Sequence, residues 1–336
     1  MNEDRNKKSN FLDRQKSVEQ ALAEATHHHN QGRFTEAERL YRSILNVDPN
    51  QPVALHLLGV LAQQANQSET ALELISKAVS IKPDYFKAHS NLGNVLNEMN
   101  YFDRAVKCFH RAIEIEPKYA QAHGNLGNAL RGLGRLEEAM VSYEKAVALM
   151  PNLVDVQINL GNLYKEGGFW EKAAQCYQKA LEYQPNFAEA YCNLGTVENL
   201  KGQQNKAIDC YRKALMIRPN YAEAHNNLGA VFQAEGQREQ AIEHYQRAIN
   251  IDPKLADARR NLGSAFYETG NFREAIECLK DTLRINPELS EVSGLMGSIF
   301  LSMGVFQKGL ELQCEGYGVI EFDFEQGVSY KLGAKK

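Results

Sequence analysis

The 336-residue sequence has a single tryptophan, six cysteines and no excess of basic residues. Lys and Arg total 38 against 42 Asp and Glu, a net charge of −4 that offers no basic surface for nucleic acid. No apolar run approaches the roughly 18–20 residues that cross a bilayer. The polar residues 1–17 lack the apolar core of a secretory signal. We therefore expect no nucleic-acid partner, no membrane association and a cytoplasmic location.

Motifs for catalysis and metal binding are also missing. The sequence has no glycine-rich phosphate loop, no G-x-S-x-G elbow and no H-E-x-x-H pair. Its cysteines lack the C-x-x-C spacing of zinc and redox sites. The three histidines at 27–29 point about 100° apart on a helix and cannot converge on one metal. We predict a chain that is not an enzyme, with no catalytic residues, no cofactor and no metal site.

The prolines establish a period. Eight of the nine are separated by 34 residues: Pro49, Pro83, Pro117, Pro151, Pro185, Pro219, Pro253 and Pro287. A glycine and an alanine recur at the same spacing, beginning at Gly59 and Ala37. A fixed period of this size means that similar structural units stack into an array.

The period defines the predicted domains. We place eight full repeats over 18–289, a degenerate capping repeat over 290–315 and a disordered polar lead over 1–17. Apolar and polar residues alternate near the end of the chain, which predicts a β-hairpin tail over 316–336 that is open to self-association. The predicted fold class is an all-α, right-handed superhelical solenoid with a short C-terminal β-hairpin.

Small residues mark the close contacts within a repeat, whose residues we number as positions 1–34. Glycine at position 8 and alanine at position 20 let two helices of a repeat approach closely. Position 15 is Gly or Asn, as a left-handed backbone conformation requires. Position 24 is aromatic in most repeats and is expected to fill the core.

Asparagine occupies position 6 in six successive repeats and position 9 in three of them, although it disfavours helix interiors. At about 100° per residue, these positions turn away from the core of the repeat and are expected to line a concave surface. A primary amide matches the N–H and C=O of a peptide backbone. The predicted peptide-binding residues are Asn91, Asn94, Asn125, Asn128, Asn159, Asn162, Asn193, Asn227 and Asn261.

The asparagine pattern can also arise without a bound peptide, in two ways. Neighbouring asparagines can hydrogen-bond along the stack as a structural ladder, or they can reflect recent duplication of the repeat. The ladder and peptide binding are compatible, because a primary amide offers two donors and one acceptor oxygen.

The unit L-G…Y/F…G…A…Y…A…P resembles the tetratricopeptide repeat, a pair of antiparallel helices. The segments AHGNLGNALRGLGRLEEA (122–139) and AYCNLGTVENLKGQQNKA (190–207) are most similar to the superhelical repeat arm of the O-linked N-acetylglucosamine transferase family. That resemblance, over roughly 52–289, implies that the asparagines hold the backbone of extended proteins. The catalytic domain of that family is far larger than the 47 residues after Leu289.

The predicted function is that of a non-catalytic scaffold for protein–protein interactions. An extended peptide or partner segment would lie in the concave groove and be held by the asparagines. The alternative is a substrate-recruiting accessory arm of a glycosyltransferase system whose catalytic unit is a separate chain.

Overall fold

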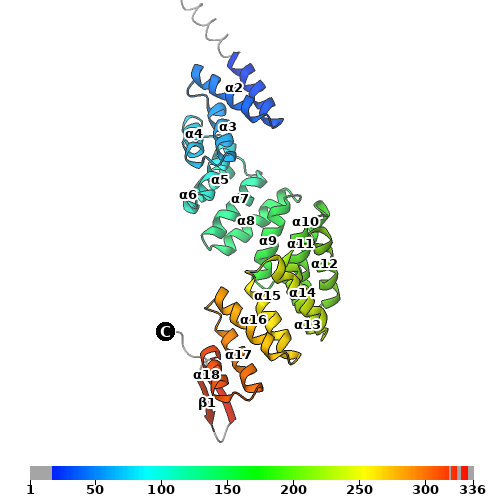
Figure 1. Cartoon of the computed structure of the whole chain (residues 1–336). Coiled ribbons are helices and arrows are strands. Elements are labelled where there is room, and N and C mark those ends of the chain that lie inside the picture. Colours follow the sequence, from blue (N-terminus) through cyan, green and yellow to red (C-terminus); the bar gives the residue numbers. More distant parts are fainter. Residues whose placement is uncertain (1–16, 318, 324–326, 332–336) are drawn as a thin grey trace, which may run out of the picture. The chain divides into compact units, whose positions relative to one another are not determined.

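The computed structural model describes residues 17–317, 319–323 and 327–331 (Figure 1). Contacts divide the chain into two compact units, residues 1–163 (unit 1) and 164–336 (unit 2), and each is described by itself. Most of the predicted lead over 1–17 lies outside the described residues, although Ser17 is already helical.

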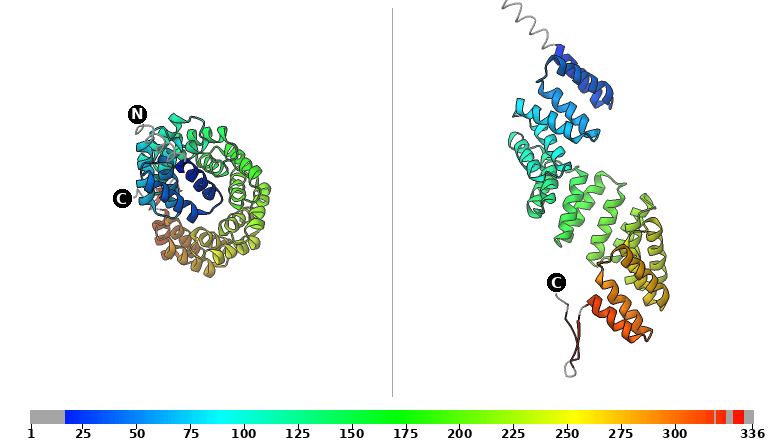
Figure 2. Two further views of the ribbon diagram at one scale, coloured as in Figure 1. Left: turned by 90° about the horizontal axis from the view of Figure 1, so that it is seen from above. Right: turned by 60° about the vertical axis from the view of Figure 1, so that its left-hand side comes forward.

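Unit 1 consists of antiparallel helix pairs that follow one another along the chain (Figure 2). After a helix over 17–30, its helices are α2 (Phe34–Val47), α3 (Pro52–Gln64), α4 (Ser68–Ile81), α5 (Phe86–Glu98), α6 (Phe102–Ile115), α7 (Ala120–Gly132) and α8 (Leu136–Leu149). The division between the units falls inside α9 (Val154–Glu166).

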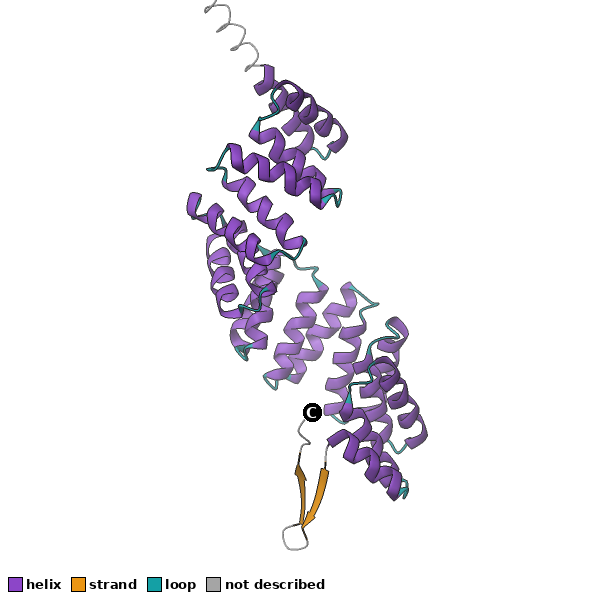
Figure 3. Cartoon of the chain, turned by 90° about the vertical axis from the view of Figure 1, so that its left-hand side faces the viewer, coloured by secondary structure: helices purple, strands orange, loops and turns teal. Residues whose placement is uncertain are grey.

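Unit 2 continues the same pattern, with short loops between the helices (Figure 3). Its helices are α10 (Trp170–Tyr183), α11 (Ala188–Leu200), α12 (Gln204–Ile217), α13 (Ala222–Ala234), α14 (Arg238–Ile251), α15 (Ala256–Glu268), α16 (Phe272–Ile285), α17 (Ser290–Ser302) and α18 (Phe306–Tyr317). None of the helices in the described part of the chain is long and apolar enough to cross a membrane.

Position 15 provides the turn between the two helices of a repeat. In the described repeats it adopts the left-handed conformation whether it is glycine or asparagine, with φ of 58° at Asn66 and 61° at Asn100. Asparagine tolerates this region better than other residues that have a side chain. The prediction for position 15 is confirmed.

The aromatic residues at position 24 form the core between the two helices. Their side chains are 0–1% exposed: Tyr41, Phe109, Tyr143, Tyr177, Tyr211 and Tyr245. The glycine at position 8 faces this ring, and a Cβ added at Gly127 would lie 2.5 Å from Cε1 of Tyr143. Glycine at position 8 is therefore required by the close approach of the ring.

The structure near the end of the chain differs from the predicted fold class. The helical part does not stop at residue 315, because α18 continues to Tyr317, whose ring packs against the backbone of Gly294. The predicted hairpin tail over 316–336 is not borne out over that range. Beyond α18, the described backbone pairs only β1 (Val319–Asp323) with β2 (Gly327–Lys331), antiparallel.

Candidate peptide-binding amide row

The nine predicted asparagines lie on the first helices of successive repeats, and we call them the amide row. In unit 1 they are Asn91 and Asn94 on α5, Asn125 and Asn128 on α7, and Asn159 and Asn162 on α9. In unit 2 they are Asn193 on α11, Asn227 on α13 and Asn261 on α15. All nine are half-buried.

In unit 1 the amides bond from one repeat to the next. Asn125 Nδ2 donates to Asn94 Oδ1 at 2.8 Å, and Asn159 Nδ2 donates to Asn128 Oδ1 at 3.1 Å. Asn91 Nδ2 lies 2.8 Å from Nε2 of His56, which stands at position 5. The asparagine at position 6 thus ties its repeat to the preceding one, as the ladder interpretation predicts.

In unit 2 the asparagine at position 6 bonds to different acceptors. Asn227 Nδ2 lies 3.8 Å from Cys192 Sγ, and Asn261 Nδ2 donates to Asn226 Oδ1 at 3.0 Å. Cys192 and Asn226 both stand at position 5 of the preceding repeat. The inter-repeat bond is present in both units, but its acceptor differs.

The residue at position 9 of the preceding repeat accounts for this choice. Where position 9 is asparagine, as at Asn94 and Asn128, the position-6 amide donates to it. Where position 9 is Val60, Thr196 or Ala230, the amide turns to position 5 instead. Positions 5 and 9 are one helical turn apart on the same face, so both are within reach.

Asn128 also connects the amide row to the aromatic core. Its Oδ1 accepts from Tyr143 Oη at 2.7 Å in addition to the amide of Asn159. In unit 2, Thr196 at the same position accepts from Tyr211 Oη at 3.3 Å. Asn128 thus joins the core of its own repeat to the next repeat, whereas the bond from Tyr211 ties Thr196 to the core of its own repeat.

His56, which accepts from the Asn91 amide, is buried, with 2% of its surface exposed. Because the Asn91 amide donates to Nε2, the proton of the neutral ring is on Nδ1, which lies 2.9 Å from Tyr85 Oη. Burial, with smaller contributions from Lys87 and His29, lowers the pKa of His56 to about 4. The ring is neutral at physiological pH and serves as an acceptor.

The histidines at position 4 have a structural role. Nε2 of His89, His123 and His225 lies 3.0–3.2 Å from the carbonyl oxygen of the period-defining proline six residues earlier. Gln157 makes the equivalent bond to Pro151 at 3.2 Å. These side chains satisfy a carbonyl in the turn between repeats, which explains why a ring N–H or an amide suits the position.

Three of the six cysteines are unsuited to nucleophilic chemistry. Burial raises the pKa of Cys192, Cys210 and Cys278 to about 11, so these thiols keep their protons at neutral pH. The described part of the chain contains no group of three or more His, Cys, Asp or Glu side chains placed to hold a metal ion.

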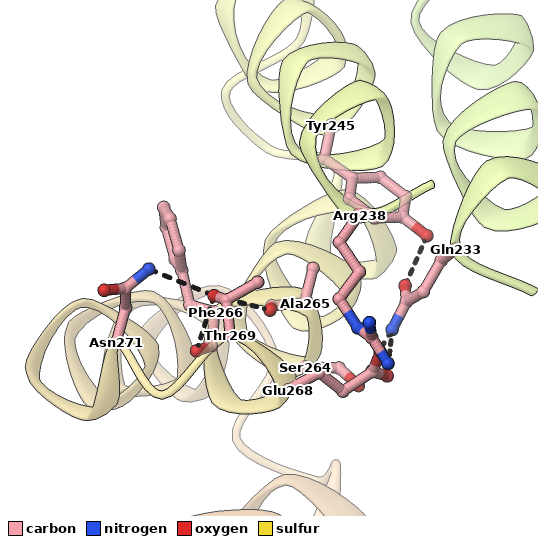
Figure 4. A network of polar contacts seen from close by, with 9 residues as sticks. All are labelled: Gln233, Arg238, Tyr245, Ser264, Ala265, Phe266, Glu268, Thr269 and Asn271. Carbon is pink, nitrogen blue, oxygen red and sulfur yellow. Dashed lines mark hydrogen bonds and ion pairs between the residues drawn. The ribbon is translucent and has the colours of Figure 1, made fainter. Parts of the chain in front are cut away.

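A second polar bridge joins repeats at positions 12 and 13. Gln233 Nε2 donates to Glu268 Oε1 at 2.5 Å, and Tyr245 Oη donates to Gln233 Oε1 at 2.8 Å (Figure 4). In unit 1, Gln63 Nε2 donates to Glu98 Oε1 at 2.7 Å. These bridges were not predicted, although the 35-residue Gln–Glu spacing is visible in the sequence of both units.

Solved structures with a similar fold include pilF of Pseudomonas aeruginosa (19% identity, 66% of this chain and 99% of that chain, TM-score 0.59). The Cut9 and Hcn1 hetero-tetramer of the APC/C is also similar (18% identity, 83% of this chain and 55% of that chain, TM-score 0.57). YrrB, described as a TPR protein with an unusual peptide-binding site, is 25% identical over 60% of this chain and 99% of that chain, with a TM-score of 0.46.

None of the curated proteins compared with the sequence matches it. Models of the tetratricopeptide repeat do match, over residues 28–92 and 220–288. A further TPR repeat model matches residues 93–134, 127–168, 161–198 and 195–236. Together these matches run from residue 28 to residue 288 without a gap, which is more than half of the sequence. The chain belongs to the tetratricopeptide repeat family.

Proposed function

We propose that this protein is a non-catalytic scaffold that holds an extended segment of a protein partner along the amide row. Tetratricopeptide repeats are in general non-catalytic modules for protein interaction. The proposal adds the site and the mode of binding: primary amides that contact the partner's main chain and tolerate many of its side chains.

The observation that carries this proposal is the hydrogen-bonding capacity left over in the amide row. Asn125 and Asn159 each donate one N–H to the preceding repeat, and a primary amide has two. Among the described residues, neither Oδ1 receives a hydrogen bond. Each half-buried amide therefore retains one donor and one acceptor, which is what a peptide group requires.

Replacement of the position-6 amides by leucine tests the proposal. Leucine is native at this position in Leu57 and Leu295, both half-buried, so the stack tolerates it. Twelve-residue peptides selected by the wild-type chain from a random library would be titrated against the Asn125→Leu, Asn159→Leu double variant. We expect on the order of tenfold weaker binding or more, the equivalent of one or two lost hydrogen bonds.

Asn152→Ala provides the matched control, since Asn152 is an exposed asparagine in a turn outside the row. The control should bind the peptides like the wild type. Circular dichroism should give the same helicity for all three proteins. Wild-type affinity in the double variant would refute binding through the amide row.

Three sequence predictions stay predictions. They are the cytoplasmic location, self-association through the end of the chain, and the specific resemblance to the O-linked N-acetylglucosamine transferase arm. The accessory-arm alternative depends on that resemblance, and the matched family models concern the repeat in general.

A further inference from the structure

Unit 2 contains a pocket of about 690 Å³ between the second helices α12 and α14, with the first helix α13 as its floor. Leu228 and Phe232 of α13 and Leu215 of α12 supply its apolar lining. Asn227 of the amide row is five residues from Phe232, about 140° away around α13. The pocket and the amide row therefore use different sides of the same helix.

Positive charge surrounds the apolar floor of this unit-2 pocket. Arg212 comes from α12 and Arg247 from α14. Arg247 forms an ion pair with Glu243, whereas Arg212 has no ion pair among the described residues. One cation is thus left for a ligand after the internal charges are paired.

Two neighbouring histidines supply a hydrogen-bond acceptor. His225 Nε2 donates to the Pro219 carbonyl, so Nδ1 of the neutral ring accepts and lies 2.9 Å from His244 Nδ1. His244 must therefore donate through Nδ1, which leaves its unprotonated Nε2 as an acceptor for an N–H of a ligand. Burial, the neighbouring His225, Arg247 and Arg212 outweigh Glu243 and lower the pKa of His244 to about 4.

A methionine at the edge of the pocket enlarges the apolar surface. Met216 of α12 is 82% exposed, the highest exposure among the large hydrophobic residues described. A flexible, polarizable thioether of this kind adapts to the side chains of a binding partner. The pocket thus combines an apolar floor, an exposed methionine and a cation without a partner.

The equivalent pocket of unit 1 has a different charge. It measures about 360 Å³, lies between α6 and α8, and carries Lys145 where unit 2 has Arg247 and Ser142 where unit 2 has His244. Its lining includes two carboxylates, Glu137 and Glu138. This unit-1 pocket provides an internal comparison at the same repeat positions.

We propose that the unit-2 pocket binds an acidic segment of a protein partner. An apolar side chain of that segment packs on Met216 at the edge of the apolar floor, and the carboxylate of a neighbouring residue lies against Arg212. A main-chain N–H of the segment donates to Nε2 of His244. The carboxylate complements the cation without a partner, and the apolar side chain covers the exposed thioether of Met216. This site is independent of the amide row.

The test uses the full chain and a fluorescein-labelled peptide, Gly-Glu-Leu-Glu-Leu-Gly-amide, followed by fluorescence anisotropy. We expect saturable binding and a loss on the order of tenfold or more in the Arg212→Glu variant, because one attractive contact becomes repulsive. The same peptide with glutamine in place of glutamate should lose a similar factor. Arg212 is exposed, so the substitution should leave the helicity unchanged.

Two control variants locate the site. Lys145→Glu in the unit-1 pocket and Asn152→Ala in an exposed turn should both bind the acidic peptide like the wild type. The proposal is overturned if the acidic peptide fails to bind at millimolar concentration, or if the glutamine peptide binds equally well. Wild-type affinity in Arg212→Glu, or a loss in either control, would overturn it as well.

Discussion

The amide rows of the two units are built from one residue type at position 6, yet they hold their repeats together differently. In unit 1, Asn94 and Asn128 at position 9 accept from the following repeat. In unit 2, position 9 is Thr196 or Ala230, and the acceptor moves to Cys192 or Asn226 at position 5. A recurring donor with exchangeable acceptors keeps the stack connected while the residues around it vary.

The hydrogen bonds made by the amide row stabilise the stack even where no partner is bound. Asn128 Oδ1 accepts two hydrogen bonds, one from the core and one from the next repeat. Substitutions in unit 1 should therefore cost more stability than the equivalent ones in unit 2.

The largest effect is expected for Gly127→Ala in unit 1. The new Cβ would lie 2.5 Å from Tyr143 Cε1 and displace the ring that donates to Asn128. We expect a loss of about 3 kcal/mol in the free energy of unfolding, measured by urea titration. Gly134→Ala is the control: nothing lies within 4 Å of a Cβ added there, and its φ of +72° limits the loss to about 1 kcal/mol. Equal losses would refute the packing argument.

Low pH should destabilise unit 1, because His56 is buried there as a neutral ring. Its pKa in the folded state is about 4, below the ordinary value of 6.5, so the unfolded chain takes up the proton first as the pH falls. The contribution of His56 to stability is complete above pH 6.5, falls by about 2 kcal/mol by pH 5 and continues to fall towards pH 4. Urea titrations of wild type and His56→Gln at pH 7.5 and 5 measure the difference. The same pH dependence in both would contradict the assignment.

Removal of the side chain at position 9 should destabilise unit 1 more than unit 2. Asn128→Ala leaves the Tyr143 hydroxyl and the Asn159 amide without an acceptor and should cost about 2 kcal/mol. Thr196→Ala removes a 3.3 Å bond from Tyr211 and the local 3.1 Å bond that Thr196 Oγ1 donates to the Cys192 carbonyl, and should cost about 0.5–1 kcal/mol. Thermal denaturation of both variants measures the two losses of stability. A larger loss in Thr196→Ala would refute the role of Asn128 as the shared acceptor of Tyr143 and Asn159.

The smallest effect on stability is expected for Ala230→Asn, which gives unit 2 the position-9 acceptor of unit 1. The Asn261 amide should turn from Asn226 to residue 230, with stability changed by about 0.5 kcal/mol or less. A crystal structure of the variant locates the bond. An Asn261 amide still directed at Asn226 would refute the rule for the choice of acceptor.

The sequence was sufficient to predict the features that depend on residue size and backbone conformation. The left-handed turn at Asn66 and the close contact at Gly127 both follow from the 34-residue spacing. It did not predict which of two acceptors an amide selects, because that choice depends on positions 5 and 9 of the preceding repeat. The pocket at Arg212 was also missed, since its lining comes from three helices whose charges differ between repeats.

The continuation of α18 to Tyr317 was missed for a related reason. Alternating apolar and polar residues follow Gly316, a residue that usually favours the end of a helix. Gly316 instead lies against the backbone of Gly294, where a Cβ would come within 2.2 Å of the Gly294 nitrogen. A contact between two glycines on different helices leaves no periodic signal in the sequence.

The most direct test of main-chain recognition by the amide row is to methylate the backbone nitrogens of a peptide that the wild-type chain has selected. We expect successive N-methylation to lower the affinity by about three- to tenfold per group, because each methyl removes a donor. Alanine substitution of the same residues should change the affinity much less. Equal affinity for the methylated and unmethylated peptides would refute recognition of the main chain by the amide row.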